Sequence, residues 1–161
     1  MEWIDLYIGL GSNEGDRDLN LLKAVNMLDS ALGRHPERIS RIIQTPALGF
    51  IGPDFYNMCV LYRIPAEGSP EEQAAGILVK IKAIERALGR KEFEPLLDDV
   101  GRRVYHDRPI DIDILYFGTE HIDLENLTIP HPLIGERDFV KIPLKEISKP
   151  GLRAAFPEIF D

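Results

Sequence analysis

Arg108-Pro109-Ile110-Asp111-Ile112-Asp113-Ile114-Leu115-Tyr116 is the stretch from which the rest of the sequence can be interpreted. Apolar and acidic residues alternate in it with a period of two, which predicts a half-buried β-strand. Its isoleucines would face a core, and Asp111 and Asp113 would stand together on the other face, roughly 7 Å apart. A divalent cation that prefers oxygen ligands, such as Mg²⁺, would offset the repulsion between these carboxylates. Arg108 is suited to binding a phosphate. A solvated strand face is the alternative.

The composition bounds the class of protein. With 161 residues, the chain is expected to form a single domain over 1–161. Its net charge of −8 argues against nucleic-acid or membrane partners and leaves small molecules as the expected ones. No apolar run reaches the length of a membrane-spanning helix, and the N-terminus lacks the basic start of a signal peptide, so we expect a cytoplasmic protein. The oligomeric state is open, with a monomer as the simplest expectation.

The first part of the chain predicts a strand, a turn and a helix. The strand covers about residues 4–10, and the Gly-rich segment 9–16 follows it. That segment either cradles a phosphate or makes a tight turn in which Asp16 or Asp18 caps the helix; it matches neither the dinucleotide nor the P-loop pattern, which favours the turn. The helix is predicted by residues at helical spacing before Gly33, namely Leu21, Val25, Leu28 and Leu32.

Two further strands are predicted over about residues 38–44 and 54–64. Between them, residues 45–53 are rich in proline and glycine, which leaves backbone groups available to a ligand. Phe55 and Asn57 share one face of the second strand and offer a stacking surface beside a donor–acceptor pair. They could bind a heteroaromatic ring, or be a core phenylalanine beside a turn asparagine.

The second helix has a strong start signal. Ser69 is its predicted N-cap, Pro70 its first residue, and Glu72 completes a capping box. Glu85 lies near its C-terminus, where a carboxylate is usually solvated because the helix dipole disfavours it. Gly89 ends the helix, and its apolar stripe consists of Ile77, Ile81, Ile84 and Leu88.

Basic residues further along could bind phosphate. Residues 90–108 read as a long loop with arginines at its ends, among them Arg90 and Arg108. It is either a phosphate-gripping lid or a loose surface insertion. His131 is held extended between two prolines and is either a phosphate contact or a structural histidine.

In this order the segments resemble the 6-hydroxymethyl-7,8-dihydropterin pyrophosphokinase family, whose members transfer pyrophosphate from ATP to a pterin alcohol in folate biosynthesis. The resemblance implies an α+β, ferredoxin-like fold of βαββαβ order, an antiparallel sheet with helices packed on one face. It spans about residues 7–147 and rests on Gly9-Leu10-Gly11-Ser12-Asn13, Thr45-Pro46-Ala47-Leu48-Gly49, Phe55-Tyr56-Asn57, Ile84-Glu85, Gly89-Arg90, Arg108 with Ile110 to Leu115, Ile129-Pro130-His131-Pro132 and Glu136 to Val140.

The resemblance also implies roles for particular residues. The catalytic set would be Arg90, Arg108, Asp111 and Asp113, with the two aspartates holding two Mg²⁺ ions that bridge the triphosphate of ATP. The ATP site would further include Glu85, Ile114, Leu127, Thr128, His131 and Arg137. In the pterin site, Asn57 and the backbone of Thr45 and Leu48 would read the ring edge, and Phe55 and Phe139 would stack on its faces. No residue is assigned as a general base.

The sequence departs from the family near the lid. Val104-Tyr105-His106-Asp107 stands where the family has a basic residue, Trp, Gly and Pro, so Asp107 adds negative charge beside a phosphate site. Pro109 replaces a small polar residue, and the loop 90–108 is longer than the family's short form. Two other functions stay open: a pterin- or nucleotide-binding paralogue without turnover, and a different Mg²⁺-dependent nucleotidyl- or glycosyltransferase that uses Asp-x-Asp.

Overall fold

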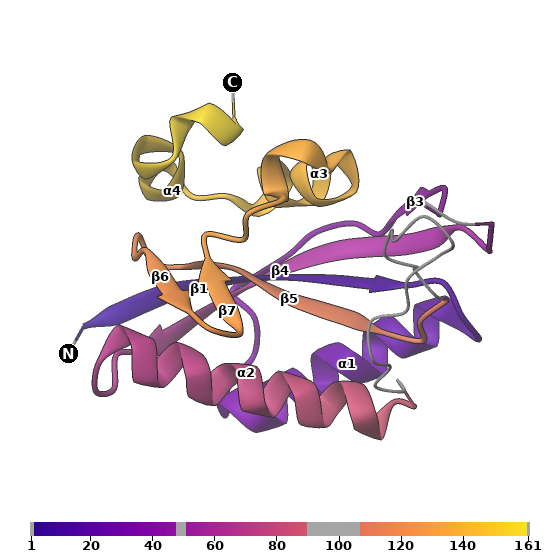
Figure 1. The fold of residues 1–161 in the computed structure, drawn as a ribbon, viewed down its shortest axis with the longest axis horizontal. Coiled ribbons are helices and arrows are strands. Elements are labelled where there is room, and N and C mark those ends of the chain that lie inside the picture. Colours follow the sequence, from indigo (N-terminus) through magenta and orange to yellow (C-terminus); the bar gives the residue numbers. More distant parts are fainter. Residues whose placement is uncertain (1, 48–50, 90–106, 161) are drawn as a thin grey trace.

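The fold is built on an antiparallel sheet (Figure 1). The computed structural model describes residues 2–47, 51–89 and 107–160. The sheet has five strands in the order β2-β4-β1-β5, with β3 also paired to β4. Its strands are β1 (Trp3–Ser12), β2 (Arg38–Ile39), β3 (Ile43–Thr45), β4 (Phe55–Pro65) and β5 (Asp111–Phe117), and a separate hairpin is formed by β6 (Ile122–Leu124) and β7 (Leu127–Ile129).

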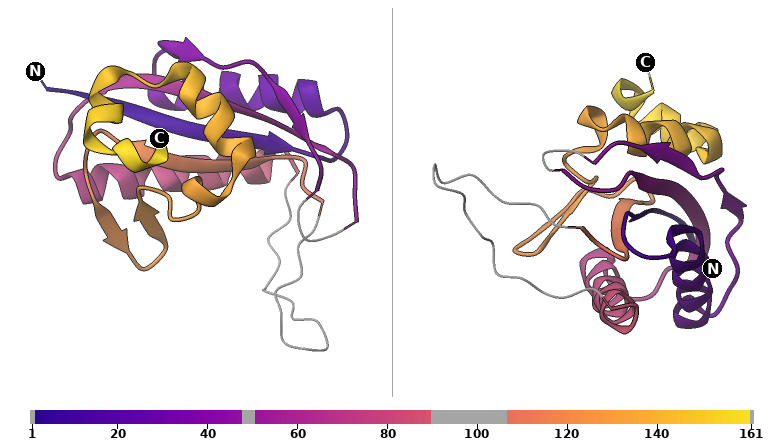
Figure 2. Two further views of the ribbon diagram at one scale, coloured as in Figure 1. Left: turned by 90° about the horizontal axis from the view of Figure 1, so that it is seen from above. Right: turned by 90° about the vertical axis from the view of Figure 1, so that its right-hand side faces the viewer.

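Helices α1 (Arg17–Leu32) and α2 (Pro70–Ala87) cover one face of this sheet (Figure 2). Their predicted caps are confirmed: the Asp16 carboxylate accepts the Leu19 N–H at 3.1 Å, and the Ser69 hydroxyl accepts the Glu72 N–H at 3.1 Å. The alternation in β5 is confirmed too, because its isoleucines are buried on this face. The core between helices and sheet includes Leu6, Ile8, Leu10, Leu21, Leu28, Val60, Tyr62, Ile77, Ile81, Ile110, Ile112 and Ile114.

The opposite face of the sheet carries helices as well. The 3-10 turn Ile134–Glu136 leads into α3 (Asp138–Ile147), which is followed by α4 (Pro150–Ala155) and a second 3-10 turn, Pro157–Ile159. These elements lie above the sheet in Figure 1, across from α1 and α2. A second core fills the space between, made of Tyr7, Cys59, Leu61, Leu115, Tyr116, Ile134, Leu144, Ile147, Leu152 and Phe156. The expectation of helices on one face is therefore wrong in this respect, because β1 and β4 bury apolar side chains on both faces.

The single strand expected over 38–44 is two short strands. Between them, the Arg41 N–H donates to the Glu146 carboxylate of α3 at 3.1 Å, so the backbone leaves the sheet at this point. The predicted strand over 54–64 and the two predicted helices agree with β4, α1 and α2.

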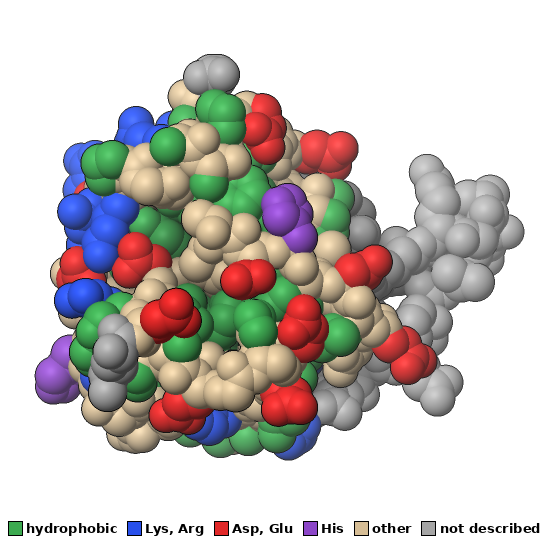
Figure 3. Space-filling model, turned by 90° about the vertical axis from the view of Figure 1, so that its left-hand side faces the viewer, with side chains coloured by type: hydrophobic (Ala, Val, Ile, Leu, Met, Phe, Trp, Pro, Cys, Tyr) green, Lys and Arg blue, Asp and Glu red, His purple; other side chains and the backbone are tan. Residues whose placement is uncertain are grey.

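The surface carries its charge in scattered groups. Figure 3 shows the end of the molecule on the left of Figure 1, where Asp and Glu side chains are spread over the face and Lys and Arg gather along one margin. Within residues 2–47, 51–89 and 107–160, none of the helices is both long and apolar enough to cross a membrane.

Candidate active site

A pocket lies on the α3 side of the sheet, and its floor is a pair of glycines in the central strand. In the sheet register, Gly9 of β1 is flanked by Cys59 and Asp113, and Gly11 is flanked by Asn57 and Asp111. Because side chains alternate along a strand, Gly9 and Gly11 address the same face. Gly9 and Gly11 therefore put no side chain between a wall on β4 and a wall on β5, which leaves a trough there.

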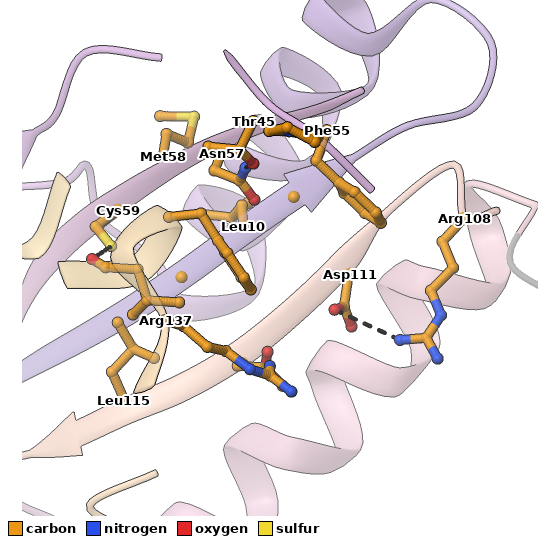
Figure 4. A pocket seen from close by; sticks show the side chains of 16 residues that line it. Leu10, Thr45, Phe55, Asn57, Met58, Cys59, Arg108, Asp111, Leu115 and Arg137 are labelled. Carbon is orange, nitrogen blue, oxygen red and sulfur yellow. Dashed lines mark hydrogen bonds and ion pairs between the residues drawn. The ribbon is translucent and has the colours of Figure 1, made fainter. Parts of the chain in front are cut away.

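Eight of the fifteen predicted site residues line this pocket (Figure 4). They come from the end of β3, from β4, from the start of β5 and from the approach to α3, which are far apart in the sequence. These residues are Thr45, Phe55, Asn57, Arg108, Asp111, Asp113, Arg137 and Phe139.

The β4 wall presents an amide beside aromatic rings. Asn57 is 5% exposed, and its Nδ2 donates to the Thr45 hydroxyl at 2.9 Å, which fixes the amide plane. Phe55 lies two residues earlier on the same strand, and Phe139 reaches the pocket from α3, with the Arg137 guanidinium 5.5 Å from its ring centre. A flat ring could lie between aromatic side chains and meet a fixed hydrogen-bonding edge. The pocket location favours ring binding over the core-phenylalanine alternative.

The β5 wall is acidic, and each carboxylate has a basic residue as its neighbour. The side chains of Asp111 and Asp113 are 27% and 39% exposed. Arg108 Nη1 lies 3.5 Å from Asp111 Oδ2, and His131 Nε2 lies 3.9 Å from Asp113 Oδ1. The Arg108 guanidinium offsets part of the repulsion between the two carboxylates.

The environment of His131 favours its neutral form. Burial lowers the pKa of His131, and the charge of Arg137 lowers it further, while Asp111 acts in the opposite direction. Its Nδ1 accepts the Leu133 N–H at 3.2 Å, so the neutral ring carries its proton on Nε2, the nitrogen that faces Asp113.

The donor set at Asp111 and Asp113 fits a phosphate-bound Mg²⁺. Mg²⁺ usually takes one or two carboxylates and completes its shell with water and substrate phosphates. Two half-exposed carboxylates at a pocket wall meet that requirement. In the described part of the chain, no group of three or more His, Cys, Asp or Glu gathers to hold a metal. Two carboxylates suit a Mg²⁺ ion whose other ligands are water and phosphate oxygens.

Glu85 departs from the general tendency of a carboxylate at this end of a helix to be solvated, and its role in the ATP site stays a prediction. Its side chain is 2% exposed, its Oε2 accepts the Ile112 N–H at 3.0 Å, and its Oε1 lies 3.4 Å from Lys82 Nζ. Strand β5 pairs with β1 on one side, so the Ile112 amide points to the other edge, where Glu85 supplies an acceptor.

The remaining predicted residues lie around this wall or outside the described residues. Ile114 is 3% exposed and packs in the core with α1 and α2, so its side chain is on the face opposite to the aspartates. Leu127 and Thr128 belong to β7. The chain after β7 is joined to β5, because the His131 N–H donates to the Leu115 carbonyl at 3.0 Å. Leu48 and Arg90 lie outside the described residues, as does most of the expected lid.

Sequence reasoning missed one polar residue at the site. Asn13, at the end of the Gly-rich segment, is completely buried and bonds to two other segments of the site. Asn13 belongs to the segment Gly9-Leu10-Gly11-Ser12-Asn13 that carries the family resemblance, but nothing in the sequence indicated its partners. Asp16 caps α1, so the interpretation of this segment as a capped turn is confirmed.

An acidic pair beside an arginine, facing an aromatic pocket across two glycines, fits the class of enzymes that transfer a phosphorus-containing group to a ring-bearing substrate. Comparison with known proteins identifies the family within this class of enzymes. A family model described as 7,8-dihydro-6-hydroxymethylpterin-pyrophosphokinase (HPPK) matches residues 7–149. The chain belongs to this family, and it is an ATP-dependent pyrophosphokinase with a role in folate biosynthesis.

Curated relatives agree with the family assignment. The Porphyromonas gingivalis protein named 2-amino-4-hydroxy-6-hydroxymethyldihydropteridine pyrophosphokinase is 39% identical to this chain over 145 residues, which are 89% of this chain and 90% of that protein. The Aquifex aeolicus protein of the same name is 38% identical to this chain over 142 residues, which are 88% of this chain and 79% of that protein. The Bacillus subtilis protein of that name is 37% identical over 143 residues (88% and 76%).

A solved structure shares the fold. A crystal structure of an HPPK-DHPS in complex with substrates superposes with a TM-score of 0.58 at 13% sequence identity. The match covers 97% of this chain but only 43% of the other, so this chain spans less than half of that protein. The likeness supports a mixed α/β fold with an antiparallel sheet and several helices.

Proposed function

We propose that this chain transfers the β,γ-pyrophosphoryl group of ATP to the hydroxymethyl oxygen of 6-hydroxymethyl-7,8-dihydropterin in a Mg²⁺-dependent reaction that releases AMP. The observation that carries the proposal is the position of Gly9 and Gly11 between the two walls. A ring held on the β4 wall can point a substituent across the bare strand toward a triphosphate on the β5 wall, which brings the reactants together without an intervening side chain.

The pterin would bind on the β4 wall. Asn57 would form hydrogen bonds with the ring edge, because the Thr45 hydroxyl already fixes its amide orientation. Phe55 and Phe139 would stack on the two ring faces. The family resemblance adds the backbone groups of Thr45 and Leu48 to this set.

ATP would bind along β5. Arg108 and Arg90 would contact phosphates, and His131 and Arg137 would add donors on the same side of the pocket. The nucleoside would lie near the outer edge of β5, bordered by Leu127 and Thr128 of β7, with the backbone of Ile114 and the Glu85 carboxylate at that edge.

Asp111 and Asp113 would hold two Mg²⁺ ions. When bound, the ions would neutralise charge on the phosphates and draw the triphosphate to the acidic wall. The hydroxymethyl oxygen then forms a bond to the β-phosphorus, the bond from that phosphorus to the oxygen bridging the α-phosphate breaks, and AMP leaves with that electron pair while the hydroxyl proton passes to water. The protein contributes mainly positioning and charge stabilisation, and we assign no general base.

We also propose the finer architecture. Strand order β2-β4-β1-β5, with α1 after β1 and α2 after β4, supports a ferredoxin-like topology, to which α3 and α4 add a layer on the second face. Residues 1–161 would act as one domain. A cytoplasmic monomer remains our expectation.

The test is AMP formation from ATP and Mg²⁺, measured with and without 6-hydroxymethyl-7,8-dihydropterin. We expect AMP only when the pterin is present, with no free pyrophosphate. Pterin or ATP binding by calorimetry without AMP formation would contradict the proposal and indicate a non-catalytic binding protein. AMP formed equally well with other alcohols would indicate a different transferase.

A further inference from the structure

Asn13 is a buried polar residue that joins three segments of the site. It follows β1 directly and is 0% exposed. Its Nδ2 donates to the Pro53 carbonyl at 3.2 Å and to Asp107 Oδ1 at 3.0 Å. Its Oδ1 accepts the Arg108 N–H at 2.7 Å. Its own N–H donates to the Arg108 carbonyl at 3.0 Å.

These bonds hold the backbone of Arg108 from both sides. One bond takes its N–H and the other its carbonyl, so residue 108 is paired with Asn13 much as in a sheet ladder, although it precedes β5. The Arg108 side chain leaves this anchored backbone and reaches Asp111. Asn13 therefore fixes the backbone from which the Arg108 guanidinium extends.

The hydrogen bond from Asn13 to the Pro53 carbonyl connects it to the segment that leads into the β4 wall. Pro53 lies just before β4, two residues ahead of Phe55. Only a side chain with both a donor and an acceptor can serve Pro53, Asp107 and Arg108 at once. Burial raises the cost of losing any of these bonds, since water cannot replace the missing partner.

We propose that Asn13 is a positioning residue that acts through Arg108 and aligns the β5 wall, where phosphate would bind, with the β4 wall, where the pterin would bind. This inference rests on the proposed function, in which Arg108 contacts a phosphate. The inference also gives Asp107 a role. Asp107 stands where the family has proline, and its carboxylate accepts a hydrogen bond from the Asn13 amide, so it helps to hold Asn13 in place.

The main test is a double-mutant cycle between Asn13→Ala and Arg108→Ala. We expect Arg108→Ala to lower kcat/KM by about 100-fold or more. Asn13→Ala should lower it by about 100-fold, because misplacing a contact group costs nearly as much as losing it. In the Arg108→Ala background, Asn13→Ala should change kcat/KM by less than about threefold, since residues that act as a unit are not additive.

A matched pair of variants isolates the bond to Asp107. Asp107→Asn and Asp107→Ala remove the same charge, but only the asparagine keeps an acceptor for the Asn13 amide. Asp107→Ala should therefore be slower than Asp107→Asn, by about threefold to tenfold. This comparison also serves if Asn13→Ala fails to fold.

Tyr62→Phe is the control for general destabilisation. The Tyr62 hydroxyl is a buried donor to Asp29 at 2.7 Å, on the face of the sheet away from the pocket. We expect this variant to lower the thermal midpoint and leave kcat/KM unchanged.

A second readout does not need turnover. Binding of α,β-methylene-ATP with Mg²⁺, measured by calorimetry, should weaken about tenfold in Asn13→Ala. Additive losses in the cycle, or wild-type nucleotide affinity in a folded Asn13→Ala protein, would overturn the positioning role. Absence of pterin-dependent AMP formation in the wild type would instead refute the proposed function, while the calorimetry would still decide whether Asn13 supports nucleotide binding.

Discussion

A single methyl group added to the pocket floor should separate pterin binding from nucleotide binding. In Gly11→Ala, the new Cβ would lie 2.9 Å from Asn57 Oδ1, whereas ordinary van der Waals contact begins at 3.4 Å. Phe55 Cδ1 lies at 3.5 Å and restricts movement in another direction. Asn57 cannot turn away without cost, because it is 5% exposed and its amide is bonded to Thr45. The amide must shift by several tenths of an ångström.

The expected loss of pterin affinity follows from the hydrogen bond between Asn57 and the pterin, which this shift would break. Loss of one hydrogen bond to a buried polar group costs about 1–3 kcal/mol. The dissociation constant for the pterin should therefore rise about 5- to 150-fold. Binding of Mg²⁺ with α,β-methylene-ATP should change less than about threefold, because the clash is with the β4 wall.

Calorimetric titration with the pterin, in the presence of the ATP analogue, measures the first effect, and titration with the analogue alone measures the second. Two other glycines provide matched controls for the same substitution. The three atoms nearest to a Cβ on Gly9 all belong to the flexible Leu115 side chain, the first at 3.4 Å, so a smaller loss is expected. A Cβ on Gly76, within α2, has no atom of the described residues within 4 Å apart from the nearby backbone of its own helix, and Gly76→Ala should raise stability by about 0.5–1 kcal/mol. Wild-type pterin affinity in a folded Gly11→Ala protein would refute the proposed role of Asn57.

Three further predictions concern other parts of the site and the core. Asp113→Ala should abolish Mg²⁺-dependent AMP formation and leave pterin affinity within about threefold, so near wild-type turnover would disprove the metal assignment. Glu85→Ala should lower the free energy of unfolding by about 1–3 kcal/mol, because the Ile112 N–H loses its acceptor. Glu85→Gln should lower it less, because the amide oxygen can still accept. Urea denaturation distinguishes the two variants, and equal losses would contradict the role of Glu85 as the acceptor at the edge of β5. The Tyr116 hydroxyl is buried without a hydrogen-bond partner among the described residues, and burial raises the pKa of Tyr116 to about 12. Tyr116→Phe should therefore leave the urea midpoint unchanged or raise it, and a lower midpoint would show that the hydroxyl has a partner.

The sequence predicts those elements whose signals are local. Alternation along 110–114 requires only that one strand face is buried, and Ser69 and Asp16 cap helices through bonds to residues three positions away. Such patterns survive folding because the interacting groups are neighbours in the chain.

Other features of the fold and the site depend on which helices and strands pack together, and the sequence does not show how these elements are arranged. Glu85 is buried because the outer edge of β5 needs an acceptor, which follows only from the strand order. The break between β2 and β3 depends on Glu146, more than a hundred residues away. Asn13 is the strongest case, since its partners at residues 53, 107 and 108 become neighbours only in the folded chain.

The second layer of helices has a consequence for the timing of synthesis. Both walls on the sheet are complete once β5 has been made, and of the buried residues in the core under α1 and α2 only Ile122 and Ile129 are still to come. The roof of the pocket comes later, because Arg137, Phe139 and Val140 lie beyond β7. Since chains emerge from the ribosome N-terminus first, an intermediate that lacks this roof would already have its acidic wall in place. The roof over the pterin would be among the last parts of the site to form on a nascent chain.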